Sequence, residues 1–253
     1  MMNSVDIGDL LGTGKEAEVY EHGALVLKLY RVTASKNAAF REAAILAHIE
    51  PFGLPAPKIS DVRQYGDRWG LLMTRARGQP FANAMISQPA LIPKYLDEMV
   101  RLHREIHGQA ARALPELKAR LGSNIRHAPF LSTAHRERLL RGLDTLPNGN
   151  VLCHGDFHPS NILGSPGQAM VVDWLDACAG SPAADVCRTY VLIHHAAPEM
   201  AMRYAETYAR ASGLALGDIF AWLPFVAASR LAEGVSKEED ELIRMAETGW
   251  SDI

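Results

Sequence analysis

The alternation of apolar and polar residues separates a strand-rich first part of the chain from a helix-rich remainder. Residues 7–30 alternate around a glycine-containing turn, which predicts two or three antiparallel strands. Further strand patterns occupy residues 58–65 and 69–75, and an apolar stripe of helical period covers residues 38–49. We therefore expect the chain to begin with an antiparallel sheet accompanied by one helix.

From about residue 78 onward, apolar residues recur mostly at every third or fourth position, as they do on one face of a helix. This period dominates residues 95–147 and much of the chain after residue 188. The pattern predicts an α+β protein with two lobes: a small β-rich lobe over residues 1–77 and a larger, mostly helical lobe over residues 78–253.

Two short apolar segments in the second part flank a polar stretch that contains His154, Asp156 and Asn161, and the second segment leads into Asp173. A carboxylate, a carboxamide five residues later and a second carboxylate twelve residues after that are the groups that Mg-dependent phosphoryl transfer needs. The flanking segments predict short strands, so we expect the three groups to converge at the end of a hairpin. The alternative is a plain hairpin, because His, Asp, Pro, Ser and Asn are common turn residues.

The full pattern, His154-Gly-Asp-Phe-His-Pro-Ser-Asn-Ile-Leu163 followed by Val171-Val-Asp-Trp174, resembles the catalytic and metal loops of aminoglycoside phosphotransferases and their relatives. Those relatives include bacterial choline, fructosamine and homoserine kinases, and the stretch is a variant of the protein-kinase catalytic loop. The resemblance implies that Asp156 is the catalytic base and that Asn161 and Asp173 hold magnesium. It also implies a bilobal protein-kinase-like fold with ATP in the cleft between the lobes.

A glycine-containing turn precedes the strand that carries Lys28. Gly12 and Gly14 would let the backbone approach a phosphate closely, although hairpins use the same residues. The segment is not a Walker P-loop, because Glu16 stands where Ser or Thr should follow Gly-Lys. It resembles the shortened glycine-rich loop of small-molecule kinases and also the loop of RIO-type protein kinases. By that resemblance, Val19 fits the apolar residue that covers the adenine.

Lys28 interrupts the apolar strand pattern Leu25-Val-Leu-Lys-Leu-Tyr30, in which it shares a face with Val26 and Tyr30. A lysine in such a strand is costly unless it has a partner or lies on a solvated edge. With the glycine loop upstream, Lys28 resembles the kinase lysine that contacts the α- and β-phosphates. We expect its carboxylate partner to be Glu42 on the next helix; a solvated helix glutamate is the alternative.

The segment Leu71-Leu-Met-Thr-Arg-Ala-Arg-Gly-Gln-Pro80 resembles the last small-lobe strand and the hinge of this family. The resemblance implies that adenine bonds to backbone groups near Met73, Thr74 and Ala76. Backbone recognition leaves little trace in a sequence, so the hinge is located only to about two residues.

Several polar residues of the second part have more than one interpretation. We expect His103 to be buried and hydrogen-bonded, and Asp185 to begin a helix and brace the catalytic loop, as the corresponding residue does in the family. Asp176 follows the metal aspartate closely, and it either faces the acceptor hydroxyl or forms a turn. The acidic run Glu238–Glu241 is either a solvated helix face or a site that helps to hold an amine-bearing acceptor.

Composition removes several classes of function. The 253 residues carry a formal net charge of −3, which argues against a nucleic-acid-binding protein. The three cysteines are an odd number without a Cys-x-x-Cys pair, so we expect neither a disulfide framework nor a zinc site. No apolar stretch approaches the roughly 20 residues of a membrane helix, and the N-terminus lacks a signal-peptide pattern. We therefore expect a cytoplasmic protein without membrane insertion.

Together these features predict an ATP- and Mg-dependent phosphotransferase that moves the γ-phosphoryl group to a hydroxyl of a small aminoglycoside-, choline- or sugar-like molecule. The short chain leaves little room for insertions that would bind a large aminoglycoside. A RIO-like protein kinase is one alternative, although no Ala-Pro-Glu follows Asp173. A nucleotide-binding regulator without small-molecule turnover is the other.

Overall fold

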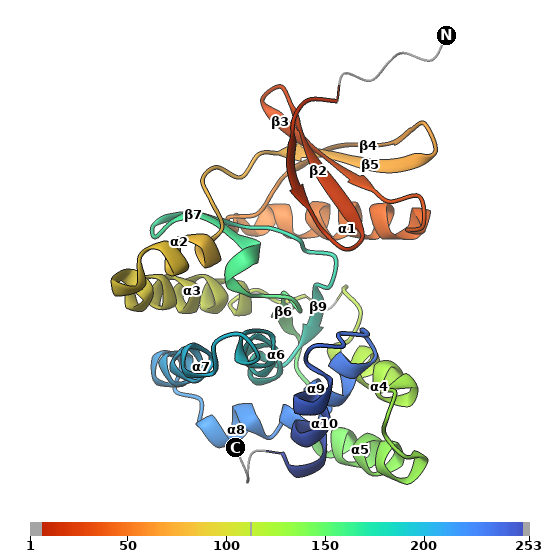
Figure 1. Cartoon of the computed structure of the whole chain (residues 1–253), viewed down its shortest axis with the longest axis vertical. Coiled ribbons are helices and arrows are strands. Elements are labelled where there is room, and N and C mark those ends of the chain that lie inside the picture. Colours follow the sequence, from red (N-terminus) through yellow and green to blue (C-terminus); the bar gives the residue numbers. More distant parts are fainter. Residues whose placement is uncertain (1–6, 112, 250–253) are drawn as a thin grey trace. The chain divides into compact units, whose positions relative to one another are not determined.

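The computed structural model describes residues 7–111 and 113–249 and contains two compact units (Figure 1). The first unit comprises the described residues up to Ala84 together with Ser160–Leu175, and the second comprises Met85–Pro159 and the described residues from Asp176 onward. These units differ from the division expected at residue 77, because the segment Ser160–Leu175 returns to the first unit. The expected absence of a signal peptide concerns residues 1–6, which lie outside the described residues.

The first unit is built on a five-stranded antiparallel sheet with one long helix against it, as the sequence predicts (Figure 1). The strand order is β1-β2-β3-β5-β4. The elements are β1 (Leu10–Thr13), β2 (Ala17–His22), β3 (Leu25–Tyr30), α1 (Lys36–Ile49), the 3-10 turn η1 (Glu50–Phe52), β4 (Ile59–Tyr65) and β5 (Arg68–Thr74).

The two faces of β3 bury different clusters, as the alternation of its residues predicts. Tyr30 packs with Ala39 and Ala43 of α1, whereas Leu27 and Leu29 form a cluster on the other face. Because Lys28 is two residues from Tyr30, β3 presents its side chain to α1. The apolar contacts of α1 therefore fix the place where a charged group must find its partner.

The segment Ser160–Leu175 is tied to the first unit by backbone hydrogen bonds. Gly164 N donates to Gln79 O at 3.0 Å, and Val171 N donates to Pro55 O at 2.7 Å. The elements of this region are α2 (Phe81–Ser87), the 3-10 turn η3 (Pro159–Asn161), β7 (Ile162–Ser165) and β8 (Gln168–Val171).

The hairpin expected from the two apolar segments is wrong in its pairing. The first segment forms β6 (Val151–Cys153), which pairs with β9 (Cys178–Gly180), whereas β8 pairs with β7. β8 bonds to β7, the strand just before it, and β6 bonds to β9, which follows the β7–β8 hairpin. A short strand pattern indicates that a strand forms but not with which strand it bonds.

The second unit is mostly helical, with α6 buried along most of its length. Pro224 lies in the first turn of α9, and Gly234 follows that helix. The elements are η2 (Pro89–Leu91), α3 (Ile92–His107), α4 (Leu117–His127), α5 (Thr133–Thr145), α6 (Pro182–His194), α7 (Pro198–Ser212), α8 (Leu216–Phe220), α9 (Leu223–Leu231) and α10 (Glu239–Thr248).

Two further expectations concern the described residues. None of their helices combines the length and the apolar character needed to cross a membrane. Cys153, Cys178 and Cys187 are buried free thiols, in agreement with the expected lack of a disulfide framework.

Candidate functional site

A cluster of one lysine and two carboxylates lies between β3, α1 and the end of the β7–β8 hairpin, all within the first unit. Lys28 Nζ is 2.9 Å from Glu42 Oε1, 2.8 Å from Glu42 Oε2 and 2.8 Å from Asp173 Oδ1. The side chains of Lys28 and Glu42 are 10% and 1% exposed, whereas that of Asp173 is 46% exposed. Glu42 is thus the partner expected for Lys28, and Asp173 joins the pair from a distant part of the chain.

The cluster keeps Lys28 charged. Burial alone would lower the pKa of Lys28, but the carboxylates of Glu42 and Asp173 outweigh it and raise that pKa. The Tyr30 hydroxyl donates to Glu42, and burial together with that carboxylate raises the pKa of Tyr30, so the hydroxyl stays protonated. Burial raises the pKa of Glu42, although Lys28 and Tyr30 favour its ionised form. With both carboxyl groups ionised, the cluster has one excess negative charge, and its exposed end is Asp173.

The backbone turn at Asp173 is joined to the backbone of Asn161 by a hydrogen bond. Asp173 has φ +63°, in the left-handed region that Asp tolerates better than most residues. The preceding residue, Val172, donates its N–H to the Asn161 carbonyl at 2.9 Å, and the buried Trp174 ring donates to Val171 O at 2.8 Å. The two residues joined through this turn carry a carboxylate and a carboxamide, which are oxygen donors of the kind that Mg²⁺ prefers.

The glycine turn and Lys28 lie along one row of the sheet. Gly12 pairs with Val19 across β1 and β2, and Val19 pairs with Lys28 across β2 and β3. Residues directly opposite in neighbouring strands place their side chains on the same face, so Val19 and Lys28 share one. A Cβ atom at Gly12 would meet nothing within 4 Å, so nothing in the folded chain requires glycine there.

Arg31 holds the far end of this turn. Its guanidinium donates to Gly14 O and to Lys15 O, each at 3.1 Å, and Gly14 N donates to Ala17 O at 2.8 Å. No sequence pattern singles out Arg31, because an arginine just after a strand is common on protein surfaces. The loop is thus supported by a cation while its glycines stay exposed.

The expected hinge residues follow or end β5. Met73 is a buried residue of the strand, and Ala76 lies just after it. Thr74 N donates to Lys58 O at 3.0 Å, and Thr74 Oγ1 accepts from Lys58 N at 2.9 Å. The Thr74 amide is therefore already engaged by the protein, which makes it a poor donor for adenine.

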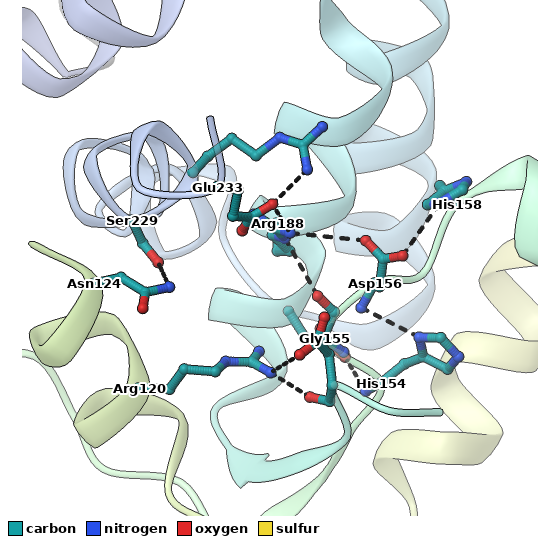
Figure 2. A network of polar contacts seen from close by, with 12 residues as sticks. Arg120, Asn124, His154, Gly155, Asp156, His158, Arg188, Ser229 and Glu233 are labelled. Atoms are coloured by element: carbon teal, nitrogen blue, oxygen red, sulfur yellow. Dashed lines mark hydrogen bonds and ion pairs between the residues drawn. The ribbon is translucent and has the colours of Figure 1, made fainter. Parts of the chain in front are cut away.

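Asp156 lies in the loop after β6, within the second unit (Figure 2). Its carboxylate is 3.4 Å from His158 Nε2 and 3.7 Å from a guanidinium nitrogen of Arg188, and its amide donates to His154 Nδ1 at 3.2 Å. Burial alone would raise the pKa of Asp156, but His158 and Arg188 outweigh it and hold that pKa below its usual range. Asp156 is therefore an ionised carboxylate at neutral pH.

The residue before Asp156 must be glycine. Gly155 has φ +79°, and a Cβ atom there would fall 2.3 Å from Asp176 O and 2.6 Å from a nitrogen of Arg120. The Arg120 guanidinium donates to Asp176 O at 2.5 Å and to its Oδ1 at 3.2 Å. Asp176, which the sequence left open between acceptor binding and a turn, thus has an arginine partner that the sequence did not reveal.

Asp185 braces the loop through four hydrogen bonds. It accepts from His154 N at 2.7 Å, Gly155 N at 2.9 Å, His103 Nε2 at 2.9 Å and His107 Nε2 at 3.1 Å. Asp185 and His103 are fully buried, as expected for His103, and Asp185 lies in the first turn of α6. The two backbone amides fix the start of the loop that carries Asp156.

The two histidines are held in turn by tyrosines. His103 Nδ1 lies 2.5 Å from the Tyr204 hydroxyl, and His107 Nδ1 lies 2.6 Å from the Tyr208 hydroxyl. A neutral imidazole that donates from Nε2 to Asp185 accepts at Nδ1 from the tyrosine hydroxyl. In agreement, burial lowers the pKa of His103 to about 3.

Among the described residues, His103, His107 and Asp185 also form the group whose ligand atoms lie close enough together to hold a metal ion. Every one of those atoms already has a hydrogen-bond partner, and two backbone amides point at the carboxylate. The donor set therefore fits a closed hydrogen-bond brace. Regular spacing is the signal that might have revealed it: His103 and His107 are one helical turn apart in α3, as are Tyr204 and Tyr208 in α7.

Comparison with known proteins identifies the relatives of this chain. The model of a family described as "Phosphotransferase enzyme family" matches residues 11–225. A search of curated proteins gives no match.

Solved structures of similar fold include aminoglycoside phosphotransferases. A thermostable mutant of APH(4)-Ia with ADP and hygromycin B is 16% identical, with TM-score 0.69 over 95% of this chain and 91% of that one. Aminoglycoside-3'-phosphotransferase of type VIII is 18% identical, with TM-score 0.60 over 89% and 90%. APH(3'')-Id from Streptomyces rimosus with ADP and streptomycin is 18% identical, with TM-score 0.63 over 85% and 90%. At these identities the likeness shows the fold, and it confirms the predicted fold class.

Proposed function

The chain belongs to the phosphotransferase enzyme family, and we propose that it transfers the γ-phosphoryl group of ATP, with Mg²⁺, to a hydroxyl group of a small molecule. The observation that carries this proposal is the contact of Lys28 with both Glu42 and Asp173. A buried lysine shared between a helix carboxylate and an exposed carboxylate is costly for stability alone, and it suits a site that receives phosphates and a metal ion.

The nucleotide would be held by the first unit. Lys28 would contact the α- and β-phosphates, the amides of Gly12 and Gly14 would face the phosphates, and Val19 would cover the adenine. Two of the similar solved structures contain ADP, which supports a nucleotide as the donor. Backbone groups of Met73 and Ala76 would bond adenine, and Thr74 would do so only through its carbonyl, since its amide is paired with Lys58.

Magnesium would be held by Asn161 and Asp173. When bound, it neutralises charge on the phosphates of the nucleotide. Asp173 is the exposed end of a cluster with one excess negative charge, so a divalent cation there is electrostatically favoured. Lys28 can then leave Asp173 for a phosphate without leaving Glu42.

Asp156 would act on the acceptor. As an ionised carboxylate it accepts a hydrogen bond from the acceptor hydroxyl and takes its proton as the hydroxyl oxygen attacks the γ-phosphorus. The bond from that phosphorus to the β–γ bridging oxygen breaks, and ADP leaves. Positioning and charge neutralisation dominate such transfers, so the orientation of Asp156 matters as much as its basicity.

The acceptor would be a small aminoglycoside-, choline- or sugar-like hydroxyl compound. Two of the similar solved structures hold an aminoglycoside, hygromycin B in one and streptomycin in the other. The acidic run Glu238–Glu241 has partners inside the second unit: Glu238 pairs with Arg230, and Glu241 pairs with His194 and His195. These contacts favour a structural role for the run and leave Asp176 as the acidic candidate for contact with the acceptor.

The test is a calorimetric titration of ATP with and without Mg²⁺, followed by a screen of ATP consumption against aminoglycosides, choline, sugars and hydroxy amino acids. We expect Mg-dependent ATP binding and ADP release with one acceptor class. Phosphorylation of protein substrates alone would indicate a RIO-like protein kinase. Tight ATP binding without turnover on any acceptor would indicate a nucleotide-binding regulator.

A further inference from the structure

Arg188 of α6 joins the loop that carries Asp156 to the turn that follows α9, all within the second unit (Figure 2). Its Nε donates to Gly155 O at 3.3 Å, and one terminal nitrogen lies 3.7 Å from Asp156 Oδ1. The same guanidinium forms two contacts with Glu233, at 2.8 and 3.0 Å. One side chain thus contacts the peptide before Asp156, the Asp156 carboxylate and a carboxylate of a distant turn.

We propose that Arg188 is a positioning residue that sets the orientation of the Asp156 carboxylate for phosphoryl transfer, and that Glu233 acts through Arg188 by fixing its guanidinium. The inference rests on the proposed function in assigning Asp156 to the reaction. No sequence pattern singles out Arg188 or Glu233.

The contact between Arg188 and the Gly155 carbonyl restricts a flexible position of the loop. Gly155 is required by its close approach to Asp176, but glycine is also the residue whose backbone is least restricted. The amide of Gly155 is bonded to Asp185 and its carbonyl accepts from Arg188, so both polar groups of this residue are fixed. Asp156 follows directly, and its side-chain direction depends on that peptide.

The contact with Glu233 determines where the guanidinium can lie. Arg188 is 10% exposed, and a buried guanidinium without a carboxylate would be costly. A bidentate arginine–carboxylate pair has a defined plane, which a lysine cannot reproduce. Because Glu233 occupies two nitrogens, the third nitrogen faces Gly155, and the 3.7 Å approach to Asp156 attracts the carboxylate without closing a tight bond.

Glu233 belongs to a longer series of ion pairs that supplies a matched control. Arg230 also contacts Glu233, at 2.5 Å, and pairs with Glu238 through two 2.9 Å contacts. Arg230 is 15% exposed, so its burial resembles that of Arg188, and it shares Glu233 with Arg188, but its other contacts are with Glu238 rather than with Gly155 or Asp156. Ser229, in the helix before this turn, accepts from Asn124 at 3.0 Å, which ties α9 to α4 (Figure 2).

A purely structural ion pair and a positioning residue predict different results for these two arginines. If Arg188 only stabilises the fold, then replacing Arg188 or Arg230 should lower the melting temperature by similar amounts and leave turnover unchanged. If Arg188 orients Asp156, then replacing Arg188 should also lower kcat, and replacing Arg230 should not.

The experiment compares Arg188→Met, Arg188→Lys, Glu233→Gln and Arg230→Met in the full chain, with the acceptor found by the screen. We expect Arg188→Met to lower kcat about 100-fold, the size typical of a small misplacement of a catalytic group, with an unchanged KM for ATP. Arg188→Lys and Glu233→Gln should lower kcat by less, and Arg230→Met should keep it within about twofold of wild type. If Arg188→Met does not fold, the kcat values of Arg188→Lys and Glu233→Gln test the proposal.

A second readout does not need turnover. The groups facing Asp156 are His154, His158 and Arg188, so removing the Arg188 charge should raise the pKa of Asp156 in a carbon-13 NMR titration of its carboxyl group. Wild-type kcat in Arg188→Met and Glu233→Gln, or an unshifted Asp156 titration, would overturn the inference and leave the proposed function standing. If the proposed function is wrong instead, the wild-type protein will turn over no acceptor, while the NMR titration will still report the effect of Arg188 on Asp156.

Discussion

Two clusters of this protein stabilise a buried carboxylate in different ways. In the first unit, Glu42 is balanced by an ammonium group, Lys28, which also contacts the exposed Asp173. In the second unit, the buried Asp185 receives four hydrogen bonds, from two backbone amides and two imidazoles. The first arrangement has an open end and excess charge, whereas the second is closed.

The open cluster is suited to binding ligands, whereas the closed cluster determines the shape of the loop that carries Asp156. An ion pair with an exposed member can exchange partners when phosphate and metal arrive, because water and ligand reach it. A carboxylate whose acceptor sites are filled by the protein has nothing to exchange, and its hydrogen bonds instead specify the loop geometry. Changes in the open cluster should therefore alter ligand affinity, and changes in the closed one should alter stability and the placement of Asp156.

The largest expected effect is on the loop that the closed cluster supports. Asp156→Asn should keep ATP binding nearly intact and lower kcat by about 10²- to 10⁴-fold, the range for loss of a general base. Steady-state kinetics on the identified acceptor and calorimetry with ATP measure the two quantities. A variant that turns over at the wild-type rate would remove Asp156 from the reaction.

Two matched variants test the comparison directly, since each replaces an aspartate by an amide of the same shape. Asp185→Asn should lower the free energy of unfolding by about 3–5 kcal/mol, because an NH₂ group would face hydrogen-bond donors. Asp173→Asn should change it by about 1 kcal/mol or less, because that side chain is half exposed. It should instead remove most of the effect of Mg²⁺ on ATP affinity.

Urea unfolding and calorimetry of both variants provide the measurement. Equal losses of stability would mean that the two clusters do not differ in the way described. Equal ATP affinity with and without Mg²⁺ in the wild-type protein would remove Asp173 from the metal site.

Acid should destabilise the closed cluster selectively. The folded-state pKa of His103 is lowered from 6.5 to about 3, so below pH 6.5 the unfolded chain binds a proton that the folded chain excludes. Stability contributed by the neutral ring is therefore complete above that pH and is lost as pH falls toward 3, by up to about 1.4 kcal/mol per pH unit. Urea unfolding at about pH 7 and about pH 5 should give a smaller difference for His103→Gln than for wild type.

The matched control for acid sensitivity is the exposed His127 of α4, whose ring contacts Ser123 O. His127→Gln should keep the wild-type difference in stability between the two pH values. An unchanged difference in His103→Gln would show that other groups cause the acid sensitivity.

The smallest expected effect concerns the glycine turn. A Cβ atom at Gly12 would meet nothing in the folded chain, so Gly12→Ala should leave stability unchanged. If phosphate approaches the backbone there, the same change should weaken ATP binding by about tenfold, or 1.4 kcal/mol. Gly217→Ala in α8, which is equally unobstructed, is the control. Wild-type ATP affinity in Gly12→Ala would place the phosphates elsewhere.

What the sequence revealed in advance lies in features that are close together in the chain. The alternation in β3 placed Lys28 on the face toward α1, and the helical stripe of α1 left Glu42 as the carboxylate able to reach it. The pairing of β6 was wrong, because a strand pattern does not name its partner.

The sequence by itself determined the fold family and the order of its elements, because periodicity and the loop around Asp156 depend on neighbouring residues. Only the tertiary structure decided which distant side chains meet. His103 and Asp185 are 82 residues apart, His103 and Tyr204 are 101 apart, and Arg188 and Glu233 are 45 apart. Nothing in the sequence shows which distant side chain each of these residues contacts. Their contacts exist because α3, α6, α7 and the turn after α9 pack around the loop, and buried polar groups must find partners wherever packing brings them together.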